Sequence, residues 1–127
     1  MNQVRDVDEL KERVLRQRHA ATVLASTAHS FGILVSTKLG QQRLELAFKL
    51  RDIIEKAGRH AEVIAMREID PTQLPAFRVD AFISTACPRL AIDDYLRFKR
   101  PIITPIELEI ALGLKKWEDY RLDSITA

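Results

Sequence analysis

The sequence predicts an α/β fold: a three-layer domain in which a short, mainly parallel four-stranded sheet is flanked by helices. Two observations predict it. Short apolar runs alternate along the chain with longer segments whose apolar residues recur at helical spacing, a pattern typical of parallel strands joined by right-handed crossovers. The chain has 127 residues, of which 46% are hydrophobic and 30% charged. That length and composition suit one folded unit, so we expect residues 1–127 to form a single domain.

The charge balance excludes several classes of protein. Lys and Arg number 20 against 18 Asp and Glu, which gives a formal net charge of +2. This excess is too small to indicate direct binding to nucleic acid or to a membrane surface. No apolar run approaches the roughly 20 residues of a membrane-spanning helix, and the charged opening over residues 1–18 lacks the apolar segment of a signal peptide. We expect a cytoplasmic protein, in keeping with the single cysteine.

A polar helix is predicted from about residue 7 to residue 27. Leu10, Val14 and Ala21 lie near one face of it. We interpret the Arg-Gln-Arg segment at 16–18 as part of a solvated face. The high polar content predicts that this helix covers an edge of the sheet or contacts another part of a larger protein.

The clearest strand and helix follow each other over residues 31–57. The apolar run at 31–36 predicts a buried strand, and the loop 37–41 follows it. The helix predicted over 42–57 carries opposite charges four residues apart together with an apolar stripe. Gly58 suits the left-handed conformation that ends a helix. The stripe consists of Leu46, Leu50, Ile53, Ile54 and Ala57.

Three further strands are predicted from the apolar runs at 61–66, 80–84 and 101–104. Between the first two of these, Asp70 and the proline after it start a turn or a short helix. Pro75 limits the length of that segment, because proline disrupts the interior of a helix.

A final helix is predicted after the last strand. Pro105 suits its first turn and Gly113 its end. Glu107 and Glu109 lie near its start, where carboxylates interact favourably with the helix dipole. In the charged tail that follows, Trp117 is predicted to pack either onto the domain or onto a partner.

Cys87 is the strongest candidate for a chemical role in this sequence. Ligands collect beyond the carboxyl ends of the strands in open parallel sheets, where the loops at 37–41 and 85–89 and the approach to Thr104 are expected to meet. Cys87 directly follows a predicted strand, and Pro88 restricts it to an extended backbone. Arg89 would favour the thiolate. A single cysteine excludes an internal disulfide and a self-contained Cys-rich metal site; a packed, inert thiol is the alternative.

Other polar residues offer weaker signals. The loop 37–41 would present backbone N–H groups to an anion at the start of the next helix, or it simply connects strand and helix. Asp93 and Asp94 are adjacent, so a capping role is favoured over paired acid and base. None of the three histidines, at positions 19, 29 and 60, is placed in the sequence to act as a base for Cys87; we expect His60 at the surface.

Six short segments, in order, resemble one enzyme family. Together they are similar to the C-terminal domain of 2-(3-amino-3-carboxypropyl)histidine synthase, the diphthamide-synthesis enzyme, and the resemblance extends from about Glu9 to Gly113. Each segment alone is weakly specific, but the set is specific. The segments are Phe31-Gly-Ile-Leu-Val-Ser-Thr37, Leu39-Gly-Gln-Gln42, Glu68-Ile-Asp-Pro71, Val79-Asp-Ala-Phe82, Thr85-Ala-Cys-Pro-Arg-Leu-Ala-Ile-Asp93 and Pro101-Ile-Ile-Thr-Pro-Ile-Glu107.

The resemblance implies three related α/β domains, each of which gives one cysteine to a shared 4Fe-4S cluster; Cys87 matches the third cysteine. It further implies that S-adenosylmethionine binds the open iron and is cleaved to a 3-amino-3-carboxypropyl radical, which adds to a histidine of elongation factor 2. Arg89, Thr37, Gly40 and Gln41 are the candidate cofactor contacts. No residue is expected to be catalytic independently of the cluster.

The resemblance also implies partners: elongation factor 2 as substrate, an electron donor, and other domains or subunits in a homodimer, or a heterodimer in eukaryotes. This sequence departs from the family at 41–43, where Gln-Gln-Arg replaces the common Arg-Gln-Gly, and at Leu96, where Gly often follows an aromatic residue. A full enzyme is nearly three times as long, so we expect a fragment that is inactive alone. The alternatives are a non-catalytic binding or assembly module and a fragment of an enzyme similar to quinolinate synthase.

Overall fold

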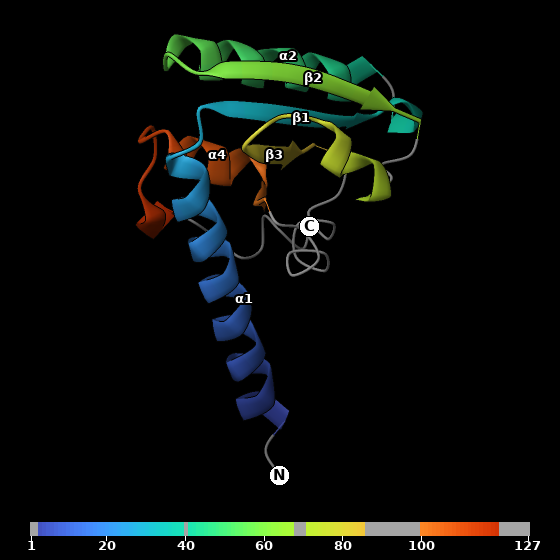
Figure 1. The fold of residues 1–127 in the computed structure, drawn as a ribbon. Helices are drawn as coiled ribbons and strands as arrows, with labels where there is room; N and C mark the ends of the chain where they lie inside the picture. Colours follow the sequence, from blue (N-terminus) through green and yellow to red (C-terminus); the bar gives the residue numbers. More distant parts are fainter. Residues whose placement is uncertain (1–2, 40, 68–70, 86–99, 120–127) are drawn as a thin grey trace.

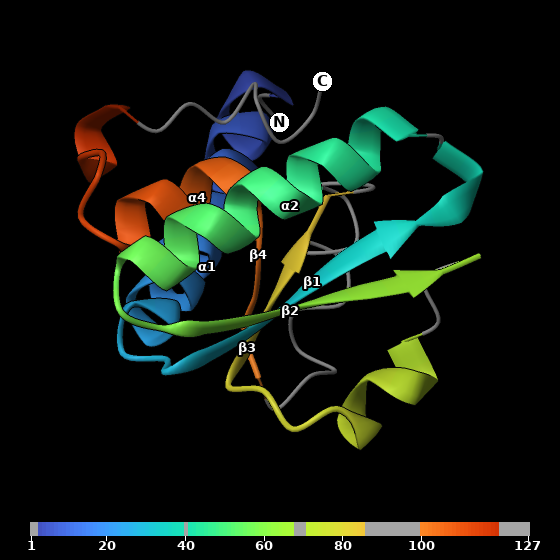
Figure 2. The ribbon, with the colours of Figure 1, turned by 90° about the horizontal axis from the view of Figure 1, so that it is seen from above.

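The four predicted strands form one parallel sheet. The computed structural model describes residues 3–39, 41–67, 71–85 and 100–119. Its strands are β1 (Ser30–Ser36), β2 (His60–Met66), β3 (Ala81–Ser84) and β4 (Ile102–Ile103), in the order β2-β1-β3-β4. All three strand pairs are parallel, which confirms the predicted fold class (Figures 1 and 2).

Three α-helices cover one face of this sheet. They are α1 (Gln3–Ser26), α2 (Gln41–Lys56) and α4 (Pro105–Ala111). Their apolar residues share one core with β1, because every second residue of a strand points to the same face. Among the buried members of that core are Ala21 and Ala25 of α1, Leu50 and Ile54 of α2, Leu108 of α4, and Phe31, Ile33 and Val35 of β1.

The opposite face is covered by a short 3-10 helix, η2 (Pro71–Ala76), which contains Pro75 and ends one residue later, as the sequence predicts. A second apolar cluster lies there and includes Leu34, Ile64, Leu74, Val79, Phe82 and Ile102. Because α2 and η2 connect successive strands on opposite faces, the sheet is the middle layer of three (Figure 2).

The glycines predicted to end helices do so. Gly58 follows α2 with φ of 81°, and Gly113 follows α4 with φ of 80°. Both are left-handed conformations that a residue with a Cβ rarely adopts. Trp117, in the 3-10 helix η4 (Trp117–Asp119), packs its ring 4.6 Å from that of His19 on α1, so it contacts the domain itself.

The interpretation of residues 16–18 as a solvated face is wrong for Arg18. Its guanidinium is fully buried, and its Nε and Nη2 donate to the two carboxylate oxygens of Glu107 at 2.8 and 2.6 Å. Nη2 also donates to the carbonyl of Ile102 at 2.6 Å. Since the carboxylate is buried as well, Glu107 serves as the partner of Arg18 in addition to lying in the first turn of α4. A charge is stable in such a core only with a paired countercharge.

The first part of α1 extends away from the sheet (Figure 1). Leu10 is 61% exposed there, whereas Ala21 and Ala25, farther along the helix, are fully buried. Among the described side chains of α1, those that belong to the core therefore come from its carboxyl-terminal half. Within the described ranges, no helix is both long enough and apolar enough to cross a membrane.

Candidate functional site

The strand order creates a switch point at the carboxyl ends of β1 and β3. These strands are neighbours in the sheet, yet the chain leaves them in opposite directions: from β1 through α2 to β2, and from β3 toward β4. In open α/β sheets a crevice forms where adjacent strands diverge in this way. Two of the three predicted loops leave the sheet at this point, after Ser36 and after Ser84. The candidate site therefore lies at this edge.

Thr85 fixes the end of β3 at this edge. Its backbone N–H and its Oγ1 both donate to the carbonyl of Leu34 on β1, at 3.2 and 2.7 Å. Its own carbonyl accepts from Nη1 of Arg43, in the first turn of α2, at 2.8 Å. Thr85 is buried, so these contacts satisfy polar groups that water does not reach. The segment that contains Cys87 therefore starts from a residue that is hydrogen-bonded both to β1 and to α2.

Arg43 is a site residue that the local sequence pattern does not predict. The sequence offers one signal, a cation in the first turn of the helix that follows the loop 37–41. Cations are normally favoured at the other end of a helix, so an arginine there suggests a specific partner. That partner, a carbonyl 42 residues away, becomes visible only in the fold.

The end of β1 is tied to the end of β2. Ser36 Oγ donates to the carbonyl of Arg67 at 2.9 Å. Thr37 follows as an exposed residue of the 3-10 helix η1 (Thr37–Leu39). Thr37 thus lies at the carboxyl edge, where the sequence predicts it, and its side chain is exposed outside the core.

The remaining candidate residues are distributed as follows. Gln41 is the first residue of α2, which begins one residue earlier than predicted. Gly40, Cys87 and Arg89 lie outside the described residues, as do Asp93 and Asp94. The structure thus brings together Thr37, the first turn of α2 and Thr85, the residue two positions before Cys87. The contacts predicted for Arg89 and Gly40 stay predictions.

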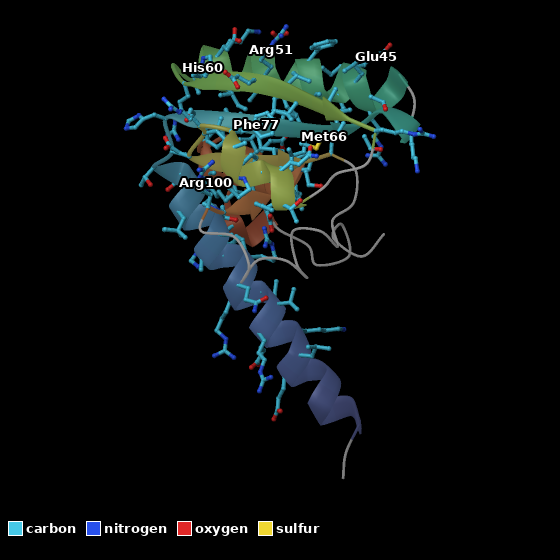
Figure 3. The ribbon with its side chains drawn as sticks, turned by 45° about the vertical axis from the view of Figure 1, so that its right-hand side comes forward. Glu45, Arg51, His60, Met66, Phe77 and Arg100 are labelled. Carbon is cyan, nitrogen blue, oxygen red and sulfur yellow. The ribbon has the colours of Figure 1, made fainter. Side chains whose placement is uncertain are left out.

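Two of the histidines lie at the opposite edge of the sheet. His60 opens β2, and His29 immediately precedes β1. Figure 3 shows His60 and Met66 at opposite ends of β2, with Met66 at the end nearer Glu45 of α2. His60 is exposed, as predicted, and its Nε2 lies 3.4 Å from Glu62. The third histidine, His19, lies on α1 against Trp117.

At this amino edge, where the strands begin, the carboxylate of Asp80 has a lowered pKa. Asp80 accepts hydrogen bonds from the backbone N–H groups of His29 and Ser30, at 3.0 and 3.3 Å. The hydrogen bond from His29 is the main cause that lowers the pKa of Asp80, and slight burial opposes it. Asp80 therefore joins the strand starts and is remote from the carboxyl edge.

The described residues do not form a complete metal site. Over residues 3–39, 41–67, 71–85 and 100–119 there is no group of three or more His, Cys, Asp or Glu side chains that could hold an ion. The chain contains one cysteine in all. This donor set fits a thiolate that joins ligands from elsewhere, and it does not fit a self-contained centre.

Comparisons with known proteins agree on one family. The model of the diphthamide synthesis protein family matches residues 1–121. The 2-(3-amino-3-carboxypropyl)histidine synthase of Pyrococcus horikoshii is 40% identical over 90% of this chain and 33% of that protein. The synthase of Methanocaldococcus jannaschii is 33% identical over 91% of this chain and 32% of its own length.

Solved structures give the same result. The crystal structure of Dph2 from Pyrococcus horikoshii with a 4Fe-4S cluster superposes with a TM-score of 0.80 at 39% identity, covering 90% of this chain and 33% of that one. The chain spans about a third of the length of these relatives. The described residues thus share the fold of about a third of Dph2 from Pyrococcus horikoshii.

Proposed function

Because this chain belongs to the diphthamide synthesis protein family, we propose that it is the third cysteine-bearing domain of an enzyme of diphthamide biosynthesis. In this proposal Cys87 supplies one thiolate to a 4Fe-4S cluster whose other ligands come from two further domains. The complete enzyme transfers the 3-amino-3-carboxypropyl group of S-adenosylmethionine to a histidine of elongation factor 2.

One observation carries the proposal. The segment that contains Cys87 begins at the switch point of the sheet, in a chain 39% identical to a relative solved with a 4Fe-4S cluster. The lone cysteine supports a shared cluster, since a single thiolate cannot hold one by itself.

The residues of this chain would hold and orient the reacting groups. Thr85 anchors the start of the cysteine segment on β1, and Pro88 limits the backbone freedom of Cys87. When bound, such a cluster supplies an iron with open coordination for S-adenosylmethionine and the electron that cleaves a carbon–sulfur bond of it.

The cofactor contacts are assigned to the same edge. Arg89 is proposed to bind the carboxylate of S-adenosylmethionine, because a guanidinium and a carboxylate form paired hydrogen bonds. Thr37, Gly40 and Gln41 are proposed to line the other side of the crevice. The exposure of Thr37 and the position of Gln41 at the start of α2 support this placement.

The proposed partners follow from the same assignment. They are the other domains or subunits of the enzyme, an electron donor, and elongation factor 2 in the cytoplasm. The chain alone is expected to be inactive, since two thirds of the length of its relatives lies outside it.

The test uses the complete enzyme, reconstituted anaerobically with iron and sulfide. Replacement of Cys87 by Ala should reduce the iron content and the absorption of the cluster, while Thr27→Ala, at an exposed position after α1, should leave both near wild type. Iron content and absorption unaffected by Cys87→Ala would overturn the ligand assignment. They would favour a binding or assembly module in which the cysteine is merely packed.

A further inference from the structure

We propose that Arg43 is a positioning residue for the cluster ligand, because it fixes the peptide through which the chain leaves β3 toward Cys87. This inference rests on the proposed function. Arg43 is an exposed residue of the first turn of α2, and its Nη1 donates to the carbonyl of Thr85 at 2.8 Å. The contact crosses the switch point from the helix after β1 to the end of β3.

The bonded atom explains why the contact matters. The carbonyl of Thr85 belongs to the planar peptide that joins Thr85 to Ala86. A donor on this oxygen therefore fixes the direction in which the chain proceeds beyond Thr85. Cys87 is two residues after Thr85 in the sequence, and because consecutive Cα atoms are about 3.8 Å apart, the backbone that connects them can span no more than roughly 8 Å. A rotation of this peptide plane would displace the thiolate directly.

The other contacts of Thr85 cannot replace this one. Its N–H and its Oγ1 both donate to the carbonyl of Leu34, and both groups lie before the rotatable bond to the carbonyl carbon. They keep β3 paired with β1 and leave the following peptide free to turn. Arg43 is the described donor to that peptide.

The charge of Arg43 adds a second effect. The guanidinium is a cation, and it lies at the edge where the cluster is proposed to sit. Reduction adds negative charge to an iron–sulfur cluster, so a nearby cation favours the reduced state and raises the potential. Removal of the cation should make the cluster harder to reduce.

Three substitutions in the complete, reconstituted enzyme test the proposal. Arg43→Met removes donor and charge, Arg43→Lys keeps both in another shape, and Lys49→Met removes an exposed charge from the same helix as the matched control. The readouts are the reduction potential of the cluster, the rate at which it loses iron to a ferrous chelator, and the melting temperature. Cys87→Ala, measured in parallel, tests the proposed function separately.

We expect Arg43→Met to lose iron about three- to tenfold faster than the wild type, the factor that one hydrogen bond contributes, and to have a more negative potential. Its iron content after reconstitution should match that of Lys49→Met, and its melting temperature should fall modestly, because the buried Thr85 carbonyl loses a donor. Arg43→Lys should recover most of both cluster properties.

Two results would overturn the role of Arg43. One is a potential and an iron-loss rate equal to those of Lys49→Met. The other is a lower melting temperature with an unchanged potential, which would make the residue structural only. A wild-type cluster that does not depend on Cys87 would instead refute the proposed function.

Discussion

Arg18 and Glu107 lie 89 residues apart in the sequence and form a fully buried, two-bond ion pair that joins α1 to α4. The same carboxylate accepts from the backbone N–H of Thr104, which precedes α4, at 2.9 Å. One buried charge pair therefore fixes a helix crossing and a helix start together. A buried pair is costly to break from one side, because the remaining charge is left without a partner.

Replacement of Arg18 by Met should lower the free energy of unfolding by about 3–5 kcal/mol, since the buried carboxylate of Glu107 loses the positive charge that it pairs with. Urea denaturation of the chain measures the loss. Arg16→Met, at an exposed position two residues earlier on α1, should change stability by less than about 0.5 kcal/mol.

The double variant Arg18→Met with Glu107→Leu separates the pair from the packing around it. It should recover a large part of the loss, because an apolar pair of similar volume replaces two buried charges. A double variant as unstable as the sum of the single ones would show that the two side chains act independently.

Gly32→Ala should destabilise the sheet by about 1–3 kcal/mol, the usual cost of overpacking a core. A Cβ at this position of β1 would lie 2.8 Å from Cδ1 of Ile64 and 3.1 Å from Cδ1 of Phe82. The change is measured as a shift of the urea midpoint. Adding Ile64→Val, which removes the nearest methyl group, should restore part of the stability; no recovery would contradict the steric explanation.

Most of the architecture follows from sequence patterns alone. The strand at 30–36 is recognisable as a short continuous apolar run, and the helix at 41–56 by apolar residues that recur at helical spacing. The positions of Gly58 and Gly113 at helix ends follow from local conformation. These features depend on neighbours within a few residues, so the sequence displays them directly.

The two arginines show what local patterns miss. Arg18 resembles a solvated residue because its helix is polar, and only the packing of α4 reveals its partner. Arg43 acquires its role from a carbonyl on β3. Both contacts join residues that are far apart in the sequence, so no helical or strand periodicity encodes them.

The pH dependence of stability should include a contribution from Asp80. Its pKa is lowered in the folded state by the hydrogen bond from His29, so it stabilises the fold above the ordinary pKa of 3.8. That contribution is lost as the pH falls through the lowered value. The stability advantage of the wild type over Asp80→Asn should therefore shrink between about pH 5 and pH 2.

Unfolding at several pH values measures this effect. Asp52→Asn, which removes an exposed carboxylate from α2, controls for net charge and should give a flatter difference from the wild type. A difference between wild type and Asp80→Asn that stays constant down to pH 2 would mean that the hydrogen bonds at the amino edge do not favour the charged carboxylate.

The protection of the Cys87 thiol tests the central claim most directly. The complete enzyme is treated with an alkylating reagent before and after its iron is removed by a chelator, and labelling of the peptide that contains Cys87 is measured by mass spectrometry. A cluster ligand should resist labelling while iron is bound and react rapidly once it is gone. A thiol that labels equally in both states, or in neither until the protein unfolds, would contradict the assignment of Cys87 as a ligand.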